Sequence, residues 1–137
     1  MNADQIRAVR STFAQIAPRG DAVAAHFYAT LFDHWPELRA LFRGPLDAQG
    51  RKLMQVLGLA VAQLDRLPEL APTLRALGRR HADIGVVHRH YEWVGQALVG
   101  TLQNELAGAF TPAAHSAWIQ AYAALAGTML KGAQQYA

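Results

Sequence analysis

The sequence predicts an all-α domain of seven or eight helices, and three observations support this prediction. Apolar side chains recur at the three- and four-residue spacing of a helix in each long segment, and no segment alternates like a half-buried strand. Proline and glycine fall between these segments. With 137 residues, of which 52% are hydrophobic, the chain can bury one core, so we expect a single domain over residues 1–137. Such helices pack into either a bundle or a layered sandwich.

The first two helices have recognisable boundaries. The first is expected over about residues 3–17, because Asn2 and Gln5 have the spacing of a capping box. Asp21 is a favourable N-cap residue and predicts the start of the second helix, which Pro36 ends.

The middle of the chain is divided by proline. A short helical turn is expected over residues 36–42 and a loop over residues 43–45. Apolar residues between positions 53 and 64 predict a helix that ends before Pro68. Pro72 predicts the start of the next helix, because the first turn of a helix tolerates a missing N–H group.

The last two helices are expected over residues 91–106 and from Pro112, with Thr111 as the cap. Residues 106–130 contain no Asp, Glu, Lys or Arg, but the helix start at Thr111 divides them. We therefore expect no membrane span. Because the first ten residues contain no signal-peptide core, we expect a cytoplasmic protein.

The composition restricts the chemistry. The chain has no cysteine, so histidine and carboxylates are the plausible metal ligands. The 13 Lys and Arg residues exceed the 10 Asp and Glu residues, giving a formal net charge of +3 without a basic block. We therefore expect no nucleic-acid partner.

His81 is the first candidate for a functional residue. It continues the apolar helical face of Leu74, Leu77 and Gly78, so it must meet a polar partner or a metal in the core. An inward histidine on its own is usually a hydrogen-bonded core residue. The surrounding helices, however, supply many aromatic residues, and a pocket with one imidazole among apolar side chains suits a flat iron macrocycle. The aromatic residues are Phe27, Tyr28, Phe42, Tyr91, Trp118 and Tyr122.

The order of these residues resembles that of a known family. The stretches in question are FYATLFDHWPELRALF (27–42), RLPELAPTLRALGRRH (66–81), HYEWVGQALVGTL (90–102) and AWIQAYAALA (117–126). They are similar to the bacterial single-domain haemoglobins and to the globin domain of flavohaemoglobins, over nearly the whole chain. The resemblance implies a globin fold, a helical sandwich around a pocket for haem b.

The resemblance also implies residue roles. His81 would be the proximal ligand of the haem iron, and Tyr28 and Gln49 would be distal hydrogen-bond donors. A donor at this position stabilises bound dioxygen, which carries partial negative charge, by about 1 to 3 kcal/mol. Tyr91 would hydrogen-bond near His81. Further side chains bordering the haem would be Phe42, Leu53, Leu57, Leu77, Val86, Val94, Trp118 and Tyr122.

The function implied is reversible binding of dioxygen, for transport or storage, with carbon monoxide and nitric oxide as further ligands. An alternative is nitric oxide dioxygenation with an external reductase, and another is a gas sensor. The sequence leaves open whether the protein is a monomer or a homodimer.

Three departures from the family bear on these implications. The loop at residues 43–48 is shorter than usual, so a neighbour such as Arg51 can take the place of Gln49. Ala133 stands where flavohaemoglobins carry a glutamate that joins the proximal tyrosine and histidine in a relay. The sequence ends at Ala137, so we expect no flavin or nicotinamide domain.

Two weaker patterns have ordinary explanations. His81, His88 and His90 form H-x6-H-x-H, a possible zinc pattern that lacks a further ligand. A set of basic residues suits haem propionates or an acidic reductase, although a solvated helix face is the preferred explanation. These residues are Lys52, Arg75, Arg79, Arg80 and Arg89.

Overall fold

The fold is all-α, as predicted. A computed structural model describes residues 1–134, and within them the chain forms six α-helices and four short 3-10 segments. The prediction of seven or eight helices therefore counted some of these short segments. The α-helices are α1 (Ala3–Ile16), α2 (Gly20–His34), α3 (Leu46–Ala62), α4 (Leu67–Asp83), α5 (His88–Leu106) and α6 (Pro112–Gln134), and the 3-10 segments are η1 (Ala17–Arg19), η2 (Pro36–Leu41), η3 (Leu64–Arg66) and η4 (Ala107–Ala109).

Two predicted helix caps are confirmed. At the start of α1, the Gln5 backbone N–H donates to Asn2 Oδ1, and the Asn2 backbone N–H donates to Gln5 Oε1, both at 2.8 Å. At the start of α6, the Ala114 backbone N–H donates to Thr111 Oγ1 at 3.1 Å. Each cap satisfies backbone N–H groups that have no partner inside the helix.

Three helices begin earlier in the sequence than predicted. Asp21 is not an N-cap, because η1 leads directly into α2 at Gly20 and places Asp21 in the first turn. A carboxylate there still favours the positive end of the helix dipole. Helix α4 begins at Leu67, so Pro68 occupies the first turn and Pro72 lies inside the helix. Helix α5 begins at His88, ahead of the predicted start at residue 91.

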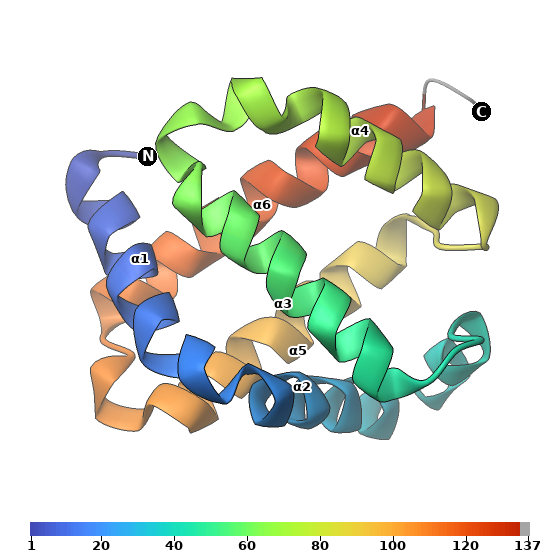
Figure 1. The fold of residues 1–137 in the computed structure, drawn as a ribbon, viewed down its shortest axis with the longest axis horizontal. Helices are drawn as coiled ribbons and strands as arrows, with labels where there is room; N and C mark the ends of the chain where they lie inside the picture. Colours follow the sequence, from blue (N-terminus) through green and yellow to red (C-terminus); the bar gives the residue numbers. More distant parts are fainter. Residues whose placement is uncertain (135–137) are drawn as a thin grey trace.

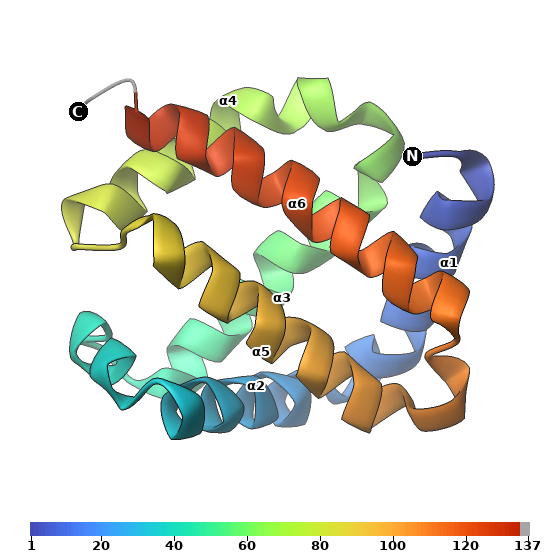
Figure 2. The same cartoon turned by 180° about the vertical axis from the view of Figure 1, so that it is seen from behind.

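The helices form two layers. Figure 1 shows α3 crossing in front of α5 and α6, and Figure 2 shows α5 and α6 running side by side across the opposite face. Helix α2 forms one edge of the molecule, and α4 lies along the opposite edge beside α6. Within residues 1–134, no helix is long and apolar enough to cross a membrane.

Helix α4 meets α6 with almost no space between the two backbones. A Cβ atom added to Gly78 would overlap the backbone carbonyl group of Met129, and one added to Gly132 would overlap that of Arg75. Since backbone atoms cannot move aside as a flexible side chain can, both positions require glycine. These contacts fix the half of α4 that carries His81 against α6.

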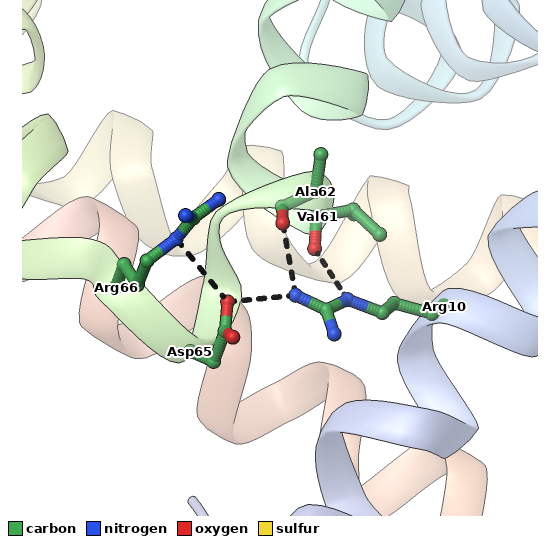
Figure 3. Close-up of polar contacts among 5 residues, drawn as sticks. All are labelled: Arg10, Val61, Ala62, Asp65 and Arg66. Carbon is green, nitrogen blue, oxygen red and sulfur yellow. Dashed lines mark hydrogen bonds and ion pairs between the residues drawn. The ribbon is translucent and has the colours of Figure 1, made fainter.

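The end of α3 is held by an arginine from α1 (Figure 3). Arg10 donates from Nε to the Val61 carbonyl oxygen at 3.1 Å, and from Nη2 to the Ala62 carbonyl oxygen at 2.8 Å. The last carbonyl groups of a helix have no partner within it, so these contacts cap α3. Arg10 also donates to Asp65 Oδ1 at 2.8 Å and lowers the pKa of that exposed carboxyl group. Arg10 therefore joins α1 to the corner that follows α3.

Candidate functional site

His81 lies in the last turn of α4 and is half-buried. Its Nδ1 atom is 2.8 Å from the carbonyl oxygen of Leu77, one turn earlier. A carbonyl oxygen only accepts, so Nδ1 carries the proton and the lone pair of the neutral ring is on Nε2. Burial lowers the pKa of His81, with a smaller contribution from the charge of Arg80, against the opposing hydrogen bond to Leu77. The ring is therefore oriented and available as a neutral ligand.

His90 has the opposite arrangement. Its Nδ1 atom accepts a hydrogen bond from the backbone N–H of Val87 at 3.0 Å, so the proton of the neutral ring is on Nε2. The lone pair that a metal would need is occupied by this cap at the start of α5. Within the described residues, no group of three or more His, Asp or Glu side chains is placed to hold a metal ion. The structure thus gives no support to a zinc site formed by His81, His88 and His90.

Tyr28 lies in the middle of an aromatic cluster. Its ring centre is 5.1 Å from that of Phe27 and 5.4 Å from that of Phe42, both edge to face, and 5.9 Å from that of Phe32 in a stacked pair. Phe42 directly follows η2, so this short segment brings its ring against α2. Burial raises the pKa of Tyr28 to about 12, and the phenol keeps its proton at any physiological pH.

The hydroxyl group of Tyr28 has a weak partner. It donates to the main-chain carbonyl oxygen of Gln49 on α3 at 3.4 Å, longer than a normal O–H···O hydrogen bond. The sequence prediction placed Gln49 near Tyr28 through its side chain, and the contact observed is with its backbone. On the same helix, Leu57 is buried in the main core, and Leu53 is half-buried and packs against that core.

Tyr91 and Tyr122 join α5 to α6. The Tyr122 hydroxyl group donates to the Tyr91 carbonyl oxygen at 2.6 Å. The Tyr91 hydroxyl group is itself buried and has no hydrogen-bond partner among the described residues. Within the described residues, the Tyr91 hydroxyl group therefore makes no hydrogen bond of the kind expected near His81. Burial raises the pKa of both phenols.

The remaining predicted site residues lie on several elements. Val94 is on α5 and Leu77 is on α4, and each is half-buried; Val86 is half-buried in the loop between these helices. Trp118 on α6 is buried, and its Nε1–H donates to Thr12 Oγ1 on α1 at 2.8 Å. Its indole N–H group is therefore used to join α6 to α1.

Helix α6 has no carboxylate at the position where flavohaemoglobins carry a glutamate. Ala133 is half-buried near the end of α6, and no Asp or Glu follows Glu105 in the sequence. No carboxylate of α6 can therefore reach Tyr91.

Of the basic set, Arg75 is half-buried, and Arg89 places its guanidinium 5.8 Å from the ring centre of Trp93. The exposed members are Lys52, Arg79, Arg80 and Arg89.

Sequence reasoning missed two features that shape this site. The first is the close contact of α4 with α6, although helical spacing had put Gly78 on the same inward face as His81. A glycine on a buried helical face is a signal of close backbone approach. The second is the Thr12 to Trp118 hydrogen bond, which joins residues 106 positions apart and has no local signal.

These residues suit an iron macrocycle better than a bare metal ion. A bare transition metal needs three or four ligands, whereas haem iron takes one imidazole from the proximal side. His81 provides a neutral imidazole with its Nδ1 proton fixed. Phe42, Leu53 and Val94 are partly buried apolar side chains that pack against the main core. The donor set therefore fits haem.

Comparisons with known proteins agree with this geometry. A sequence profile of the Globin family matches residues 25–129. The chain is 29% identical over 126 residues to a flavohemoprotein of Vibrio cholerae, and 33% identical over 122 residues to a flavohemoprotein of Rhizobium meliloti. These alignments cover 90% and 86% of this chain but 32% and 30% of the relatives, so the chain spans about a third of their length.

A solved structure shows the same fold over nearly the whole chain. The bacterial globin from Campylobacter jejuni superposes with a TM-score of 0.88 and covers 98% of both chains, at 21% sequence identity. The fold and the family profile define a haem-binding protein of the globin family, and the chain belongs to that family. Within the family it is related to the globin domains of bacterial flavohemoproteins.

Proposed function

We propose that this globin holds haem b through His81 and binds dioxygen reversibly, as an oxygen carrier or store. When bound, haem supplies the iron at which dioxygen, carbon monoxide or nitric oxide is held. The Leu77 carbonyl oxygen orients the imidazole of His81 and fixes the tautomer that presents Nε2. Such a second hydrogen bond is the usual companion of a histidine ligand. The lowered pKa of His81 keeps the ring neutral near neutral pH.

Tyr28 carries the proposal that the gas is dioxygen. Its proton is held only by a 3.4 Å contact with the Gln49 carbonyl oxygen, so turning toward a better acceptor costs little. The surrounding rings of Phe27, Phe32 and Phe42 are apolar and offer no competing hydrogen-bond acceptor to the phenol. A phenol donor in such surroundings favours a gas that takes on negative charge when bound, which dioxygen does more than carbon monoxide.

The residues around His81 favour an oxygen carrier over an enzyme that activates dioxygen. A carboxylate that hydrogen-bonds toward His81 through Tyr91 would make the imidazole more electron-donating. The Tyr91 hydroxyl group has no partner within the described residues, and the side chain of Ala133 cannot accept a hydrogen bond from it. His81 is then a weaker donor, which favours binding of dioxygen over its activation.

Oxygen titration of the haem-loaded, reduced protein tests the proposal. We expect a spectral change on adding dioxygen that reverses when dioxygen is removed, with carbon monoxide competing for the same site. Rapid oxidation of the haem by dioxygen, without a reversible phase, would contradict the proposal. Sustained consumption of nitric oxide with an added reductase would instead indicate a dioxygenase.

A further inference from the structure

A cleft of about 470 Å³ opens between α2 and α3, where the N-terminal end of α3 lies beside α2 (Figure 1). Its walls are mostly apolar and include Ala25, Ala29, Phe32 and Leu46. Tyr28 also lines this cleft, although only 6% of its surface is exposed. The side chain that we assign to the gas-binding site therefore borders this cleft with the small part of its surface that is exposed.

The chemistry of the cleft suits a small neutral molecule. Apolar walls give water and ions few hydrogen-bond partners, whereas apolar cavities readily take up uncharged gases such as xenon. Asp47 and Arg51 stand at its edge as an exposed ion pair with a separation of 3.9 Å. Because a neutral gas is not steered by these charges, the width of the opening governs its entry.

A second groove provides the comparison. It lies between α5 and α6, has a volume of about 680 Å³ and is lined by Tyr91 and Tyr122. There the Tyr122 hydroxyl group already donates at 2.6 Å, and the Tyr91 hydroxyl group is buried without a partner among the described residues. Neither tyrosine is the distal donor of the proposed function, whereas Tyr28, which lines the cleft between α2 and α3, is that donor.

We propose that the cleft between α2 and α3 is the entry and exit route for the diatomic gas, leading past Ala25 and Ala29 to Tyr28. This inference rests on the proposed function, since it needs a gas-binding site at Tyr28. It predicts a kinetic effect that is distinct from that of the distal hydrogen bond. Narrowing a route slows entry and exit by the same factor and leaves affinity unchanged, whereas removing a donor changes mainly the exit rate.

The Ala25→Trp variant of the haem-loaded protein tests the route, with carbon monoxide as the probe. Ala25 is exposed on α2 and lines the cleft, so a large side chain there fills the cleft without entering the core. We expect association and dissociation rates each to fall by roughly tenfold, as a modestly higher barrier implies, with an unchanged equilibrium constant. The matched control is Ala123→Trp, which places the same side chain in the groove between α5 and α6 and should change neither rate.

Xenon provides a second measurement that does not depend on the variant or on haem. Xenon added to the wild-type protein should shift the methyl resonances of Ala25 and Ala29 in NMR spectra, and leave that of Ala123 unchanged. Failure to hold haem would overturn the proposed function and the route with it. Retained haem with unchanged rates in Ala25→Trp, equal slowing in Ala123→Trp, or no xenon shift at Ala25 and Ala29 would overturn the route alone.

Discussion

Helix α4 meets α6 through two glycines at which backbone meets backbone. Helix α2 meets α3 at Gly50, where an added Cβ would come within 2.9 Å of the Ala24 side chain, and an open cleft lies beside this contact. The first contact carries His81, whose ring is held by a 2.8 Å hydrogen bond to Leu77. The second carries Tyr28, whose hydroxyl group is held by a 3.4 Å contact to Gln49. The two sides of the candidate site therefore differ in how firmly the chain fixes its functional side chain.

This difference matches the tasks that we assign to the two residues. A permanent ligand of the iron must be held in a fixed position, because any movement of α4 would move His81 with it. A donor that must release and recapture a gas gains from a weak resting hydrogen bond, because it exchanges one partner for another at little cost.

Substitution Gly78→Ala should have the largest effect, because its new methyl group overlaps the backbone of Met129. The helices must separate, and we expect a loss of about 3 kcal/mol or more in the free energy of unfolding, the upper range for overpacking. Chemical denaturation measures it. The control is Gly127→Ala on α6, where a new Cβ meets nothing within 4 Å and where alanine should stabilise the helix by about 0.5 to 1 kcal/mol. Equal effects of the two variants would contradict the close contact.

Substitution Tyr28→Phe removes the distal donor and keeps the ring. The haem-loaded variant should release dioxygen roughly ten to a hundred times faster, since about 1 to 3 kcal/mol of hydrogen-bond energy is lost. Stopped-flow displacement by carbon monoxide measures the rate. The control Tyr122→Phe removes a hydroxyl group that is not the distal donor, and it should leave the rate of dioxygen release nearly unchanged. Gln49→Ala should have a smaller effect than Tyr28→Phe, because the observed contact is with the Gln49 backbone. An unchanged rate in Tyr28→Phe and Gln49→Ala, alone and combined, would mean that neither side chain donates to the gas.

Substitution Ala133→Glu offers Tyr91 the acceptor that it lacks. We expect a lower iron reduction potential and a higher iron–histidine stretching frequency, because His81 becomes more electron-donating. Ala133→Gln is the uncharged control and should shift both values less. Resonance Raman spectra of the ferrous protein measure the frequency. A wild-type frequency that is already high would show that another acceptor replaces the missing carboxylate.

Acidification should weaken the cap at the start of α5. Burial, together with the charge of Arg89, lowers the pKa of His90 in the folded state, with Glu37 acting in the opposite direction. The unfolded chain therefore binds the proton more readily, so stability is full above the ordinary histidine pKa of about 6.5 and falls as the pH drops below it. Unfolding free energies at pH 7.5 and pH 5.5 measure the loss. In His90→Gln an amide oxygen can accept from Val87 without titrating, and the loss should be smaller; an equal loss would exclude His90 as its source.

Much of this arrangement was predictable because it depends on local spacing. The three- and four-residue pattern put Leu77 and His81 on one inward face, and the Asn2 and Gln5 pair marked the first helix correctly. Helix starts at Asp21 and Pro72 were wrong, because neighbouring residues already allowed a helix to begin earlier. A residue that favours a helix start marks the observed boundary only when the residues before it are not themselves helical.

The features that could not be predicted depend on distant segments. The Trp118 indole meets Thr12 across the molecule, and Arg10 caps a helix about 50 residues away. Sequence similarity suggested a side-chain role for Gln49, whereas only the packing of α2 on α3 shows that its carbonyl oxygen meets Tyr28. Such contacts are set by the path of the whole chain.

Absorption spectra of the haem-loaded protein in its oxidised, reduced and carbon monoxide-bound states test the central claim, that His81 alone holds the iron from the chain's proximal side. We expect wild type and His88→Ala to give the same Soret bands, because His88 is exposed at the start of α5. His81→Ala should lose haem or hold it with an altered Soret band. Unaltered spectra for His81→Ala in all three states would contradict the assignment.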